Sequence, residues 1–542
     1  MQGPTDKRGA HSRGAPHWLI PTLALALAVL LVVVGAATLL RDRPSRPSGT
    51  PSKLPSLSSP TAAPTDPAAS PGFASYYGQK PKWQGCYSGA QCTKVTVPLD
   101  WQEPEGKTLQ LAVVRLPATG RGDRLGALVM NPGGPGASGV QYVGEYGQYI
   151  TTKQLRARYD LVGFDPRGVG SSDPVDCLPD RQLDQYLAED GDPNKPGGLA
   201  VMRSEAKTFV AGCERLSGGL LPYIGTPSAA RDMDVLRAVL GEQRLNYLGK
   251  SYGTLLGATY AGLHPNRVGR MVLDGALDPA SSNADVVVGQ AGGMEQALRA
   301  FVTACLDDAK QCPLKGDVEH AVGQVRELLA KVEQAPLPTD DLARPLTPPL
   351  AVTGIVNFLY SQASWPDLAE ALGAALSGDG NDLLASADSY ADRQPDGRYA
   401  SNLLEAFTAI NCLDYPMNDA PAAMDQVARR AEEASPTFGA YLAYGEITCG
   451  QWPVRPERTP EPIRAEGAPP ILVVGTTGDP ATPYQWAQAL AGQLSSGRLL
   501  TWQGEGHTAY SRGSKCIDGA VDEFFIDGVL PGKGATCPAG SR

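Results

Sequence analysis

Histidine is scarce in this chain of 542 residues: five are present, and no CxxC pair occurs. Structural zinc sites usually combine such cysteine pairs with histidines, so the sequence argues against one. Basic residues are in the minority, with 47 Lys and Arg against 57 Asp and Glu and a net charge of −10. A chain without basic excess lacks the positive field that nucleic-acid binding requires. We therefore expect no metal, no organic cofactor and no nucleic-acid partner.

Apolar and charged residues occur in the proportions of a globular protein. Hydrophobic residues make up 42% of the chain and charged residues 19%. The length exceeds that of one ordinary domain, and such a chain can bury a large core. One large domain with an insertion, or two domains, would fit this composition.

The N-terminal region carries an apolar run from Trp18 to Leu40, preceded by basic residues in segment 1–17. At 1.5 Å per residue a helix of this length spans the ~30 Å hydrocarbon core of a membrane. The small residues at 34–36 would suit signal cleavage, but apolar residues continue beyond them. We expect an uncleaved signal-anchor at 18–40 behind a cytoplasmic region at 1–17. The alternative is a cleaved signal peptide and a secreted protein.

Segment 41–72 is rich in Pro, Ser and Thr, so we expect it to be an extended linker that holds the domain away from the membrane. All ten cysteines lie beyond this linker. An even number of cysteines behind an export signal indicates disulfides, although buried free thiols are the alternative. Spacing alone leaves the connectivity open, and we expect nearest neighbours to pair: Cys86 with Cys92, Cys177 with Cys213, Cys305 with Cys312, Cys412 with Cys449, and Cys516 with Cys537.

Beyond the linker, short β-type runs alternate with helical patterns. Several are continuous apolar runs that end in Gly or Asp, which is typical of buried parallel strands. The alternation predicts an α/β protein with a doubly wound, mostly parallel sheet. The runs are CTKVTVPLDW, TLQLAVVRL, LGALVMNPG, YDLVGFDPRG, LNYLGKS, RMVLDGALDP, ILVVGTTGDP and GRLLTWQGEG.

One interval interrupts this alternation. Segment 279–469 contains no clear core strand but several helical patterns, and it is too long for a loop. We expect a helical cap at 279–469, inserted before the strand ILVVG. The sheet domain would then consist of an N-terminal part at 73–278 and a C-terminal part at 470–542.

The strongest local motif is Gly249-Lys250-Ser251-Tyr252-Gly253, which follows the strand LNYLG and precedes a helix of small residues. A serine at the centre of GxSxG, between a strand and a helix, sits on a strained turn that exposes its hydroxyl oxygen. Glycines are needed on both sides, because side chains there would collide with the neighbouring strand or helix. We therefore predict that Ser251 is a nucleophile.

A serine nucleophile needs a histidine base and an acid that orients the imidazole ring. Of the five histidines, His507 follows the last strand in a glycine-rich loop that could bring the ring to the serine. Asp479 follows the strand ILVVG, which gives the chain order Ser, Asp, His. Asp274 and Asp278 are rivals for the acid, and Glu505 is a weaker one.

The tetrahedral intermediate needs backbone N–H donors for its oxyanion. The turn Asn131–Gly136 (NPGGPG) ends the strand ALVM, and Gly134 is its better donor because Pro135 has no N–H. The N–H of Tyr252, directly after the nucleophile, is the second expected donor. The turn is not a phosphate loop, because the GK[ST] ending is absent.

Taken together, these motifs resemble the tripeptidyl aminopeptidase-like branch of the prolyl aminopeptidase-related α/β-hydrolases of actinobacteria. The resemblance runs from about residue 75 to the C-terminus. It implies the α/β-hydrolase fold, a triad of Ser251, Asp479 and His507, and oxyanion donors at Gly134 and Tyr252. It also implies an exported enzyme that releases short N-terminal peptides. We expect this enzyme to form an acyl-enzyme and to be a monomer. The stretches that carry it are NPGGPGASG, LVGFDPRGVGSSDP, LNYLGKSYGT, VLDGALDP, NCLDYP, GTTGDPATP and GEGHTAY.

An aminopeptidase must hold a protonated amino terminus, so a carboxylate should face the substrate from the cap. Glu405 and Asp414, which flank Asn411-Cys412, are the candidates, and Trp365 and Tyr360 are candidates for lining the subsites. The same triad also serves esters, so a carboxylesterase or lipase-like hydrolase is the alternative activity. A non-catalytic binding protein or cell-envelope scaffold is the competing class.

Overall fold

Each of the predicted strand runs is part of one large sheet in the computed structural model, which describes residues 52–53, 72–189, 197–308 and 310–540. Within these residues the sheet has ten strands in the order β12-β10-β9-β8-β7-β5-β6-β4-β3-β2. Strands from β6 to β12 in this order are parallel, and β2, β3 and β4 are antiparallel. The strands are β2 (Gln84–Gly85), β3 (Gln91–Pro98), β4 (Thr108–Leu116), β5 (Gly126–Asn131), β6 (Tyr159–Phe164), β7 (Leu245–Lys250), β8 (Val268–Asp274), β9 (Ile471–Gly478), β10 (Gly497–Glu505) and β12 (Ala535–Cys537).

The central strands are buried on both faces because helices cover both sides of the sheet. Every residue of β5 is buried, and its side chains alternate between two cores. Ala127 and Val129 pack with helices α7, α8 and α18, whereas Leu128 and Met130 pack with α3 and α19. This alternation follows from the two-residue period of a strand and makes the sheet doubly wound. The predicted fold class is therefore confirmed.

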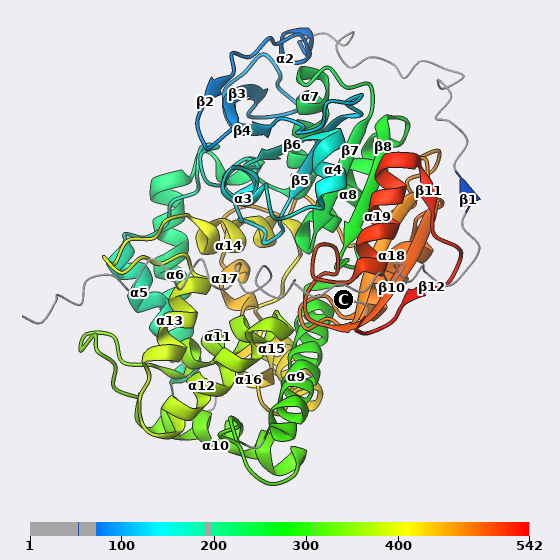
Figure 1. Cartoon of the computed structure of the whole chain (residues 1–542). Coiled ribbons are helices and arrows are strands. Elements are labelled where there is room, and N and C mark those ends of the chain that lie inside the picture. Colours follow the sequence, from blue (N-terminus) through cyan, green and yellow to red (C-terminus); the bar gives the residue numbers. More distant parts are fainter. Residues whose placement is uncertain (1–51, 54–71, 190–196, 309, 541–542) are drawn as a thin grey trace, which may run out of the picture. The chain divides into compact units, whose positions relative to one another are not determined.

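Helices of the sheet domain alternate with its strands along the chain. Figure 1 shows them around the sheet. They are α2 (Ala74–Tyr77), α3 (Gly139–Tyr146), α4 (Lys153–Arg158), α5 (Asp180–Ala188), α6 (Gly198–Ser217), η2 (Leu221–Tyr223), α7 (Thr226–Val239), α8 (Tyr252–Leu263), η3 (Pro265–Arg267), α18 (Tyr484–Gln493) and α19 (Lys515–Asp527).

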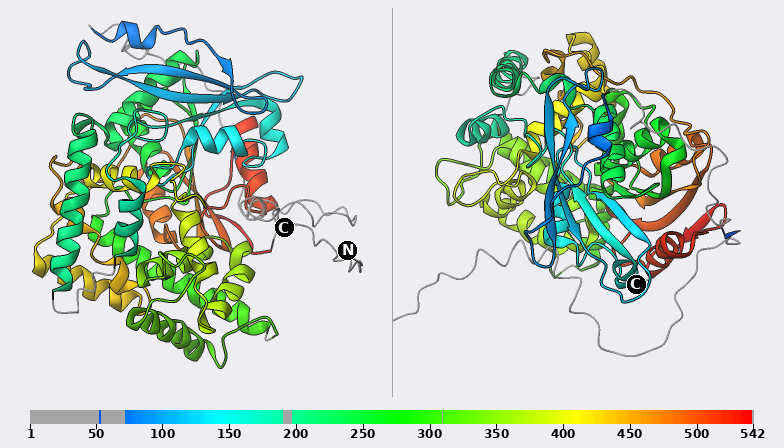
Figure 2. Two further views of the ribbon diagram at one scale, coloured as in Figure 1. Left: turned by 90° about the vertical axis from the view of Figure 1, so that its left-hand side faces the viewer. Right: turned by 90° about the horizontal axis from the view of Figure 1, so that it is seen from above.

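The interval between β8 and β9 is helical. Its helices have a core of their own and lie at the opposite end from the N-terminal strands in the left view of Figure 2. Helices α5 and α6 contact cap helices α11 and α17, so the cap also meets helices that precede it in the chain. The cap helices are α9 (Asn283–Asp307), α10 (Val318–Gln334), α11 (Pro348–Leu359), η4 (Gln362–Ser364), α12 (Trp365–Leu376), α13 (Asn381–Tyr390), α14 (Leu403–Asp414), α15 (Pro421–Ala434), α16 (Gly439–Leu442) and α17 (Glu446–Gly450).

The structure contains disulfides between the nearest-neighbour cysteines, and the described part of the chain has no free cysteine. Each bond lies within the sheet domain or within the cap. The bonds are Cys86–Cys92, Cys177–Cys213, Cys305–Cys312, Cys412–Cys449 and Cys516–Cys537. Because reducing compartments keep thiols free, five disulfides favour a location outside the cytoplasm.

The predicted N-terminal region and anchor, residues 1–17 and 18–40, lie outside the described residues. The linker 41–72 does too, except for Gly72 and for β1 (Ser52–Lys53), which pairs with β11 (Val529–Leu530). Among the helices that the structure describes, none combines the length and the hydropathy needed to span a bilayer.

Candidate active site

Ser251 lies on the sharp turn between β7 and α8, with φ 54° and ψ −126°. A positive φ is rare for a residue with a side chain and marks backbone strain. The flanking glycines make the turn possible. A Cβ on Gly249 would collide with the carbonyl oxygen of Gly253, and a Cβ on Gly253 would lie 2.8 Å from Oδ1 of Asn131. The structure thus gives Ser251 the strained strand–turn–helix setting that the motif predicts.

Asp479 and His507 meet where β9 and β10 end. Nδ1 of His507 lies 2.8 Å from Oδ1 and 3.0 Å from Oδ2 of Asp479. The carboxylate also accepts the N–H groups of Ala481, Thr482 and Thr508, at 3.0, 2.8 and 3.1 Å. Asp479 is buried, and these donors fix its plane. A carboxylate held in this way assigns the proton of the imidazole to Nδ1 and leaves Nε2 as the base.

Nε2 of His507 is buried and makes no hydrogen bond to any residue that the structure describes. Ser251 and His507 both lie close to residues 274–275. The N–H of Ser251 donates to the carbonyl oxygen of Asp274 at 2.9 Å, and a Cβ on Gly275 would lie 3.3 Å from Cε1 of His507. Hydrogen bonds between catalytic groups are often long before substrate binds. An unpartnered ring nitrogen beside a nucleophile turn is suited to accept the serine proton.

The rival acids have other partners. The carboxylate of Asp274 accepts backbone N–H groups of the loop after His507, and burial raises its pKa. Asp278 accepts the side-chain N–H of Gln493 at 2.6 Å. Glu505 packs against Gly478, and burial raises its pKa too. Among the described residues, Asp479 is therefore the carboxylate that is hydrogen-bonded to the imidazole.

The glycine-rich turn after β5 lies against Ser251. A Cβ on Gly133 would come within 2.8 Å of Cβ and 3.4 Å of Oγ of Ser251. The N–H of Gly133 is engaged, because it donates to Oδ1 of Asn131 at 3.0 Å. The next amide along the turn is that of Gly134. Tyr252 is the first residue of α8, so its N–H has no acceptor within the helix. The residue before Gly134 thus contacts Ser251, and Tyr252 follows Ser251 directly; the oxyanion role of these two amides stays a prediction.

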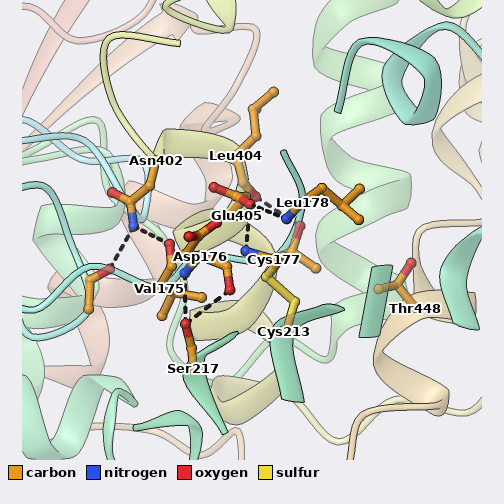
Figure 3. Close-up of a disulfide and its surroundings, with 12 residues drawn as sticks. Val175, Asp176, Cys177, Leu178, Cys213, Ser217, Asn402, Leu404, Glu405 and Thr448 are labelled. Atoms are coloured by element: carbon orange, nitrogen blue, oxygen red, sulfur yellow. Dashed lines mark hydrogen bonds between the residues drawn. A yellow bond between two sulfur atoms is a disulfide. The ribbon is translucent and has the colours of Figure 1, made fainter. Parts of the chain in front are cut away.

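Glu405 lies at the start of α14 beside the disulfide Cys177–Cys213 (Figure 3). Its Oε1 accepts the N–H groups of Cys177 and Leu178 at 2.7 and 2.9 Å. Burial raises the pKa of this carboxyl to about 7. Glu405 is therefore already bound to the backbone of segment 177–178. The structure does not support the prediction that it is an open amine-binding group.

Asp414, at the end of α14, is completely buried. Its carboxylate accepts the N–H of Thr226 at 2.9 Å and the hydroxyl of Thr226 at 2.5 Å, and burial raises its pKa to about 6. The Thr226 hydroxyl in turn contacts the hydroxyl of Tyr252. Asp414 thus supports Tyr252, the residue after Ser251, through Thr226. Because Asp414 is fully buried, a substrate amine could not reach its carboxylate. The prediction of an amine site at Glu405 and Asp414 is corrected on these grounds.

The cap contacts the site on two sides, and sequence patterns missed both contacts. On one side, the N–H of His507 donates to the carbonyl oxygen of Tyr360 at 2.8 Å, and the two rings meet edge to face at 5.4 Å. On the other, a Cβ on Gly136 would lie 2.5 Å from the carbonyl oxygen of Leu403 and 3.0 Å from the amide nitrogen of Phe407. The glycine in NPGGPG therefore marks where α14 approaches the turn. Trp365, by contrast, is buried in the core of the cap.

Two family models match the chain: one for the α/β-hydrolase fold at residues 126–312 and one described as TAP-like protein at residues 435–537. Serine protease Hip1 of Mycobacterium tuberculosis is 39% identical over 487 residues, which are 85% of this chain and 91% of that protein. Carboxylesterase B of the same species is 38% identical, with 83% and 86% covered. Tripeptidyl aminopeptidase of Streptomyces lividans is 33% identical, with 84% and 86% covered.

Proposed function

The chain belongs to the TAP-like serine hydrolases of the α/β-hydrolase fold, and from this we propose that it is an exported peptidase that releases short peptides from the N-termini of its substrates. The observation that carries the proposal is the arrangement around Ser251: a strained nucleophile turn, an Asp479–His507 pair and a glycine turn against the serine. The relatives named serine protease and tripeptidyl aminopeptidase support a peptide as substrate.

In the proposed reaction His507 removes the hydroxyl proton of Ser251 through Nε2, and the serine oxygen attacks the peptide carbonyl. The N–H groups of Gly134 and Tyr252 stabilise the oxyanion. The imidazolium, held by Asp479, then protonates the departing amine. Water, deprotonated by His507, releases the acyl group and restores the serine.

Cleavage near a chain end is favoured by the two cap contacts. Tyr360 contacts the site beside His507, and α14 contacts the turn at Gly136. A cap that packs on two sides of Ser251 restricts the directions from which a long chain can reach it. We infer that substrates enter by one end, which is how an exopeptidase limits the peptide that it removes.

Export is supported by the five disulfides and by the apolar run at 18–40. Disulfides persist in oxidising compartments and are rare in the cytoplasm. The mass of the N-terminal peptide of the mature protein tests whether the protein stays attached to the membrane. An uncleaved signal-anchor keeps residues 18–40, whereas a secreted protein loses them.

Blocking the substrate's amino terminus is expected to lower kcat/KM for Ala-Ala-Pro-type p-nitroanilides by at least about 100-fold, because an aminopeptidase recognises the protonated amine and acetylation removes its charge and its N–H donors. Turnover of free and acetylated peptides by the full chain measures this. Equal cleavage of the two would contradict the aminopeptidase proposal.

The alternative, a carboxylesterase, is favoured by the relative named carboxylesterase B. Short p-nitrophenyl esters in the same assay separate the two activities. Rapid ester turnover without peptide turnover would select the esterase.

Phe407 is expected to contact the acyl side of the substrate. Its backbone nitrogen lies where α14 approaches Gly136, and the residue is 40% exposed. An exposed aromatic residue on this helix can bury an apolar substrate side chain. We expect Phe407→Ala to lower kcat/KM about 10-fold for substrates with a large apolar residue before the cleaved bond, and to have little effect where that residue is glycine.

Leu342, which is 94% exposed elsewhere in the cap, offers a matched control. The Leu342→Ala variant should leave both classes of substrate unaffected. An equal loss on glycine and apolar substrates in Phe407→Ala would show that the ring has no role in selectivity.

A further inference from the structure

Lys250, the residue before the nucleophile, is buried, although lysine is rarely found inside proteins. It ends β7, and its Nζ donates to the carbonyl oxygen of Tyr510 at 2.8 Å. Tyr510 belongs to the loop that carries His507. The chain therefore places a buried cation next to Ser251 and uses it to hold the backbone of the histidine loop.

Asp274 holds the same loop from the neighbouring strand. It is opposite Lys250 in the pairing of β7 with β8. Its carboxylate accepts the N–H of Ala509 at 2.9 and 3.2 Å and the N–H of Tyr510 at 3.0 Å. Asp479 accepts the N–H of Thr508, so three successive backbone N–H groups of the loop, at 508–510, donate to buried carboxylates.

The loop needs such support because it is strained. Thr508 and Ser511 have φ values of 64° and 62°, which is unfavourable for residues with side chains. Strained backbone persists only where its surroundings determine it firmly. The Lys250 and Asp274 contacts lie between these two strained residues. Without them the loop is expected to relax and to carry His507 away from its position.

We propose that Lys250 and Asp274 are positioning residues of the reaction, which clamp the loop 508–510 so that Nε2 of His507 faces Ser251. The inference rests on the proposed function, because it assumes that His507 serves Ser251. A buried ion pair that only stabilises the fold would usually join its charges directly. Here each partner binds a different backbone group of the histidine loop.

Burial lowers the pKa of Lys250 to about 8, and several charged groups face it from the elements around it. Asp274 on β8 and Asp518 on α19 raise this pKa, whereas Arg512 of the histidine loop lowers it. Above pH ~8 the ammonium becomes an amine, which donates a weaker hydrogen bond and loses its attraction to Asp274. We therefore expect kcat to fall as the pH rises through about 8.

Unfolding through Lys250 cannot explain such a fall. The pKa of this lysine is lower in the folded chain than in the unfolded chain, so between pH ~8 and ~10.5 the unfolded chain binds more protons. Stability from this group rises with pH in that window. A loss of kcat there would therefore report the position of His507 and not the loss of the fold.

The test compares Lys250→Met, Lys250→Gln and an exposed control, Lys94→Met on β3, in the full chain. We expect Lys250→Met to lower kcat about 100-fold with KM changed less than twofold, because the Tyr510 carbonyl loses its donor. Lys250→Gln keeps an N–H donor that does not titrate. It should recover part of kcat and lack the fall above pH ~8, while Lys94→Met should match the unmodified chain.

Unchanged kcat in Lys250→Met, or an alkaline fall that persists in Lys250→Gln, would overturn the clamp. Fluorophosphonate labelling separates this failure from failure of the proposed function. If the unmodified chain is labelled and Lys250→Met is labelled equally fast, the clamp alone is wrong. If the unmodified chain is not labelled, the proposed function itself fails. Near-ultraviolet circular dichroism shows whether each variant is folded.

Discussion

Replacing Ser251 by alanine is expected to abolish covalent labelling by a fluorophosphonate and to lower peptide turnover by at least about 10⁴-fold. The hydroxyl oxygen is the group that forms the acyl-enzyme, and the structure offers no second serine on the same strained turn. Alanine differs by one oxygen atom, so the fold should be retained. Intact-protein mass spectrometry of labelled and unlabelled chains measures the effect, and peptide mapping places the adduct.

Ser204→Ala, at an exposed position on α6, is the matched control and should label like the unmodified chain. Because labelling requires a nucleophile but not a particular substrate, this experiment separates an enzyme from a non-catalytic scaffold. Labelling that survives in Ser251→Ala, or fails in a folded unmodified chain, would show that Ser251 is not the nucleophile.

The sheet and the Asp479–His507 pair could be predicted from the sequence because their signals are local. Parallel strands buried on both faces appear as continuous apolar runs, and each run became a strand. Asp479 and His507 each follow such a run, and strands that are neighbours in a parallel sheet bring such residues to the same edge. The short strands β2 and β12 were missed because two or three residues carry no recognisable period.

The roles of the cap residues could not be predicted, because their contact partners are distant in the sequence. Glu405 was a reasonable amine ligand as a carboxylate on a cap helix, but its donors at Cys177 and Leu178 lie more than 200 residues away. No periodicity tells which face of α14 meets that segment. The same reason hid the contact between Tyr360 and His507, which joins the cap to the C-terminal part of the sheet domain.

Lys250 was hidden for a different reason. The motif GxSxG allows any residue at its second position, so a lysine there is expected to be a solvated residue. A buried lysine is costly unless its ammonium group finds an acceptor and an opposite charge, and here the acceptor lies in the histidine loop and the charge, Asp274, on β8. The sequence therefore shows that a lysine precedes Ser251, but the role of this lysine could be inferred only from its tertiary contacts.

Asp479→Asn is expected to lower kcat by about 10⁴-fold with KM nearly unchanged, and to separate the two carboxylates that hold the histidine loop. Oδ1 of Asp479 accepts two backbone N–H groups and lies 2.8 Å from Nδ1 of His507, so an asparagine would keep its oxygen there and place its NH₂ group at the Oδ2 position, 3.0 Å from the same Nδ1. The amide has no negative charge to stabilise the imidazolium, and its NH₂ group can only donate, which favours the ring proton on Nε2, where the nitrogen could no longer accept the proton of Ser251.

Asp274→Asn makes no such demand on the imidazole, because Asp274 binds the amides of Ala509 and Tyr510 and not the ring. Its loss should loosen the loop and lower kcat about 10-fold, an expectation set by one weakened charge-assisted hydrogen bond. Comparison of kcat for the two variants at one pH therefore shows which carboxylate orients the imidazole and which one holds the loop. If Asp274→Asn were the more damaging change in a folded chain, the acid of the triad would be Asp274, and the contact between Asp479 and His507 would be structural.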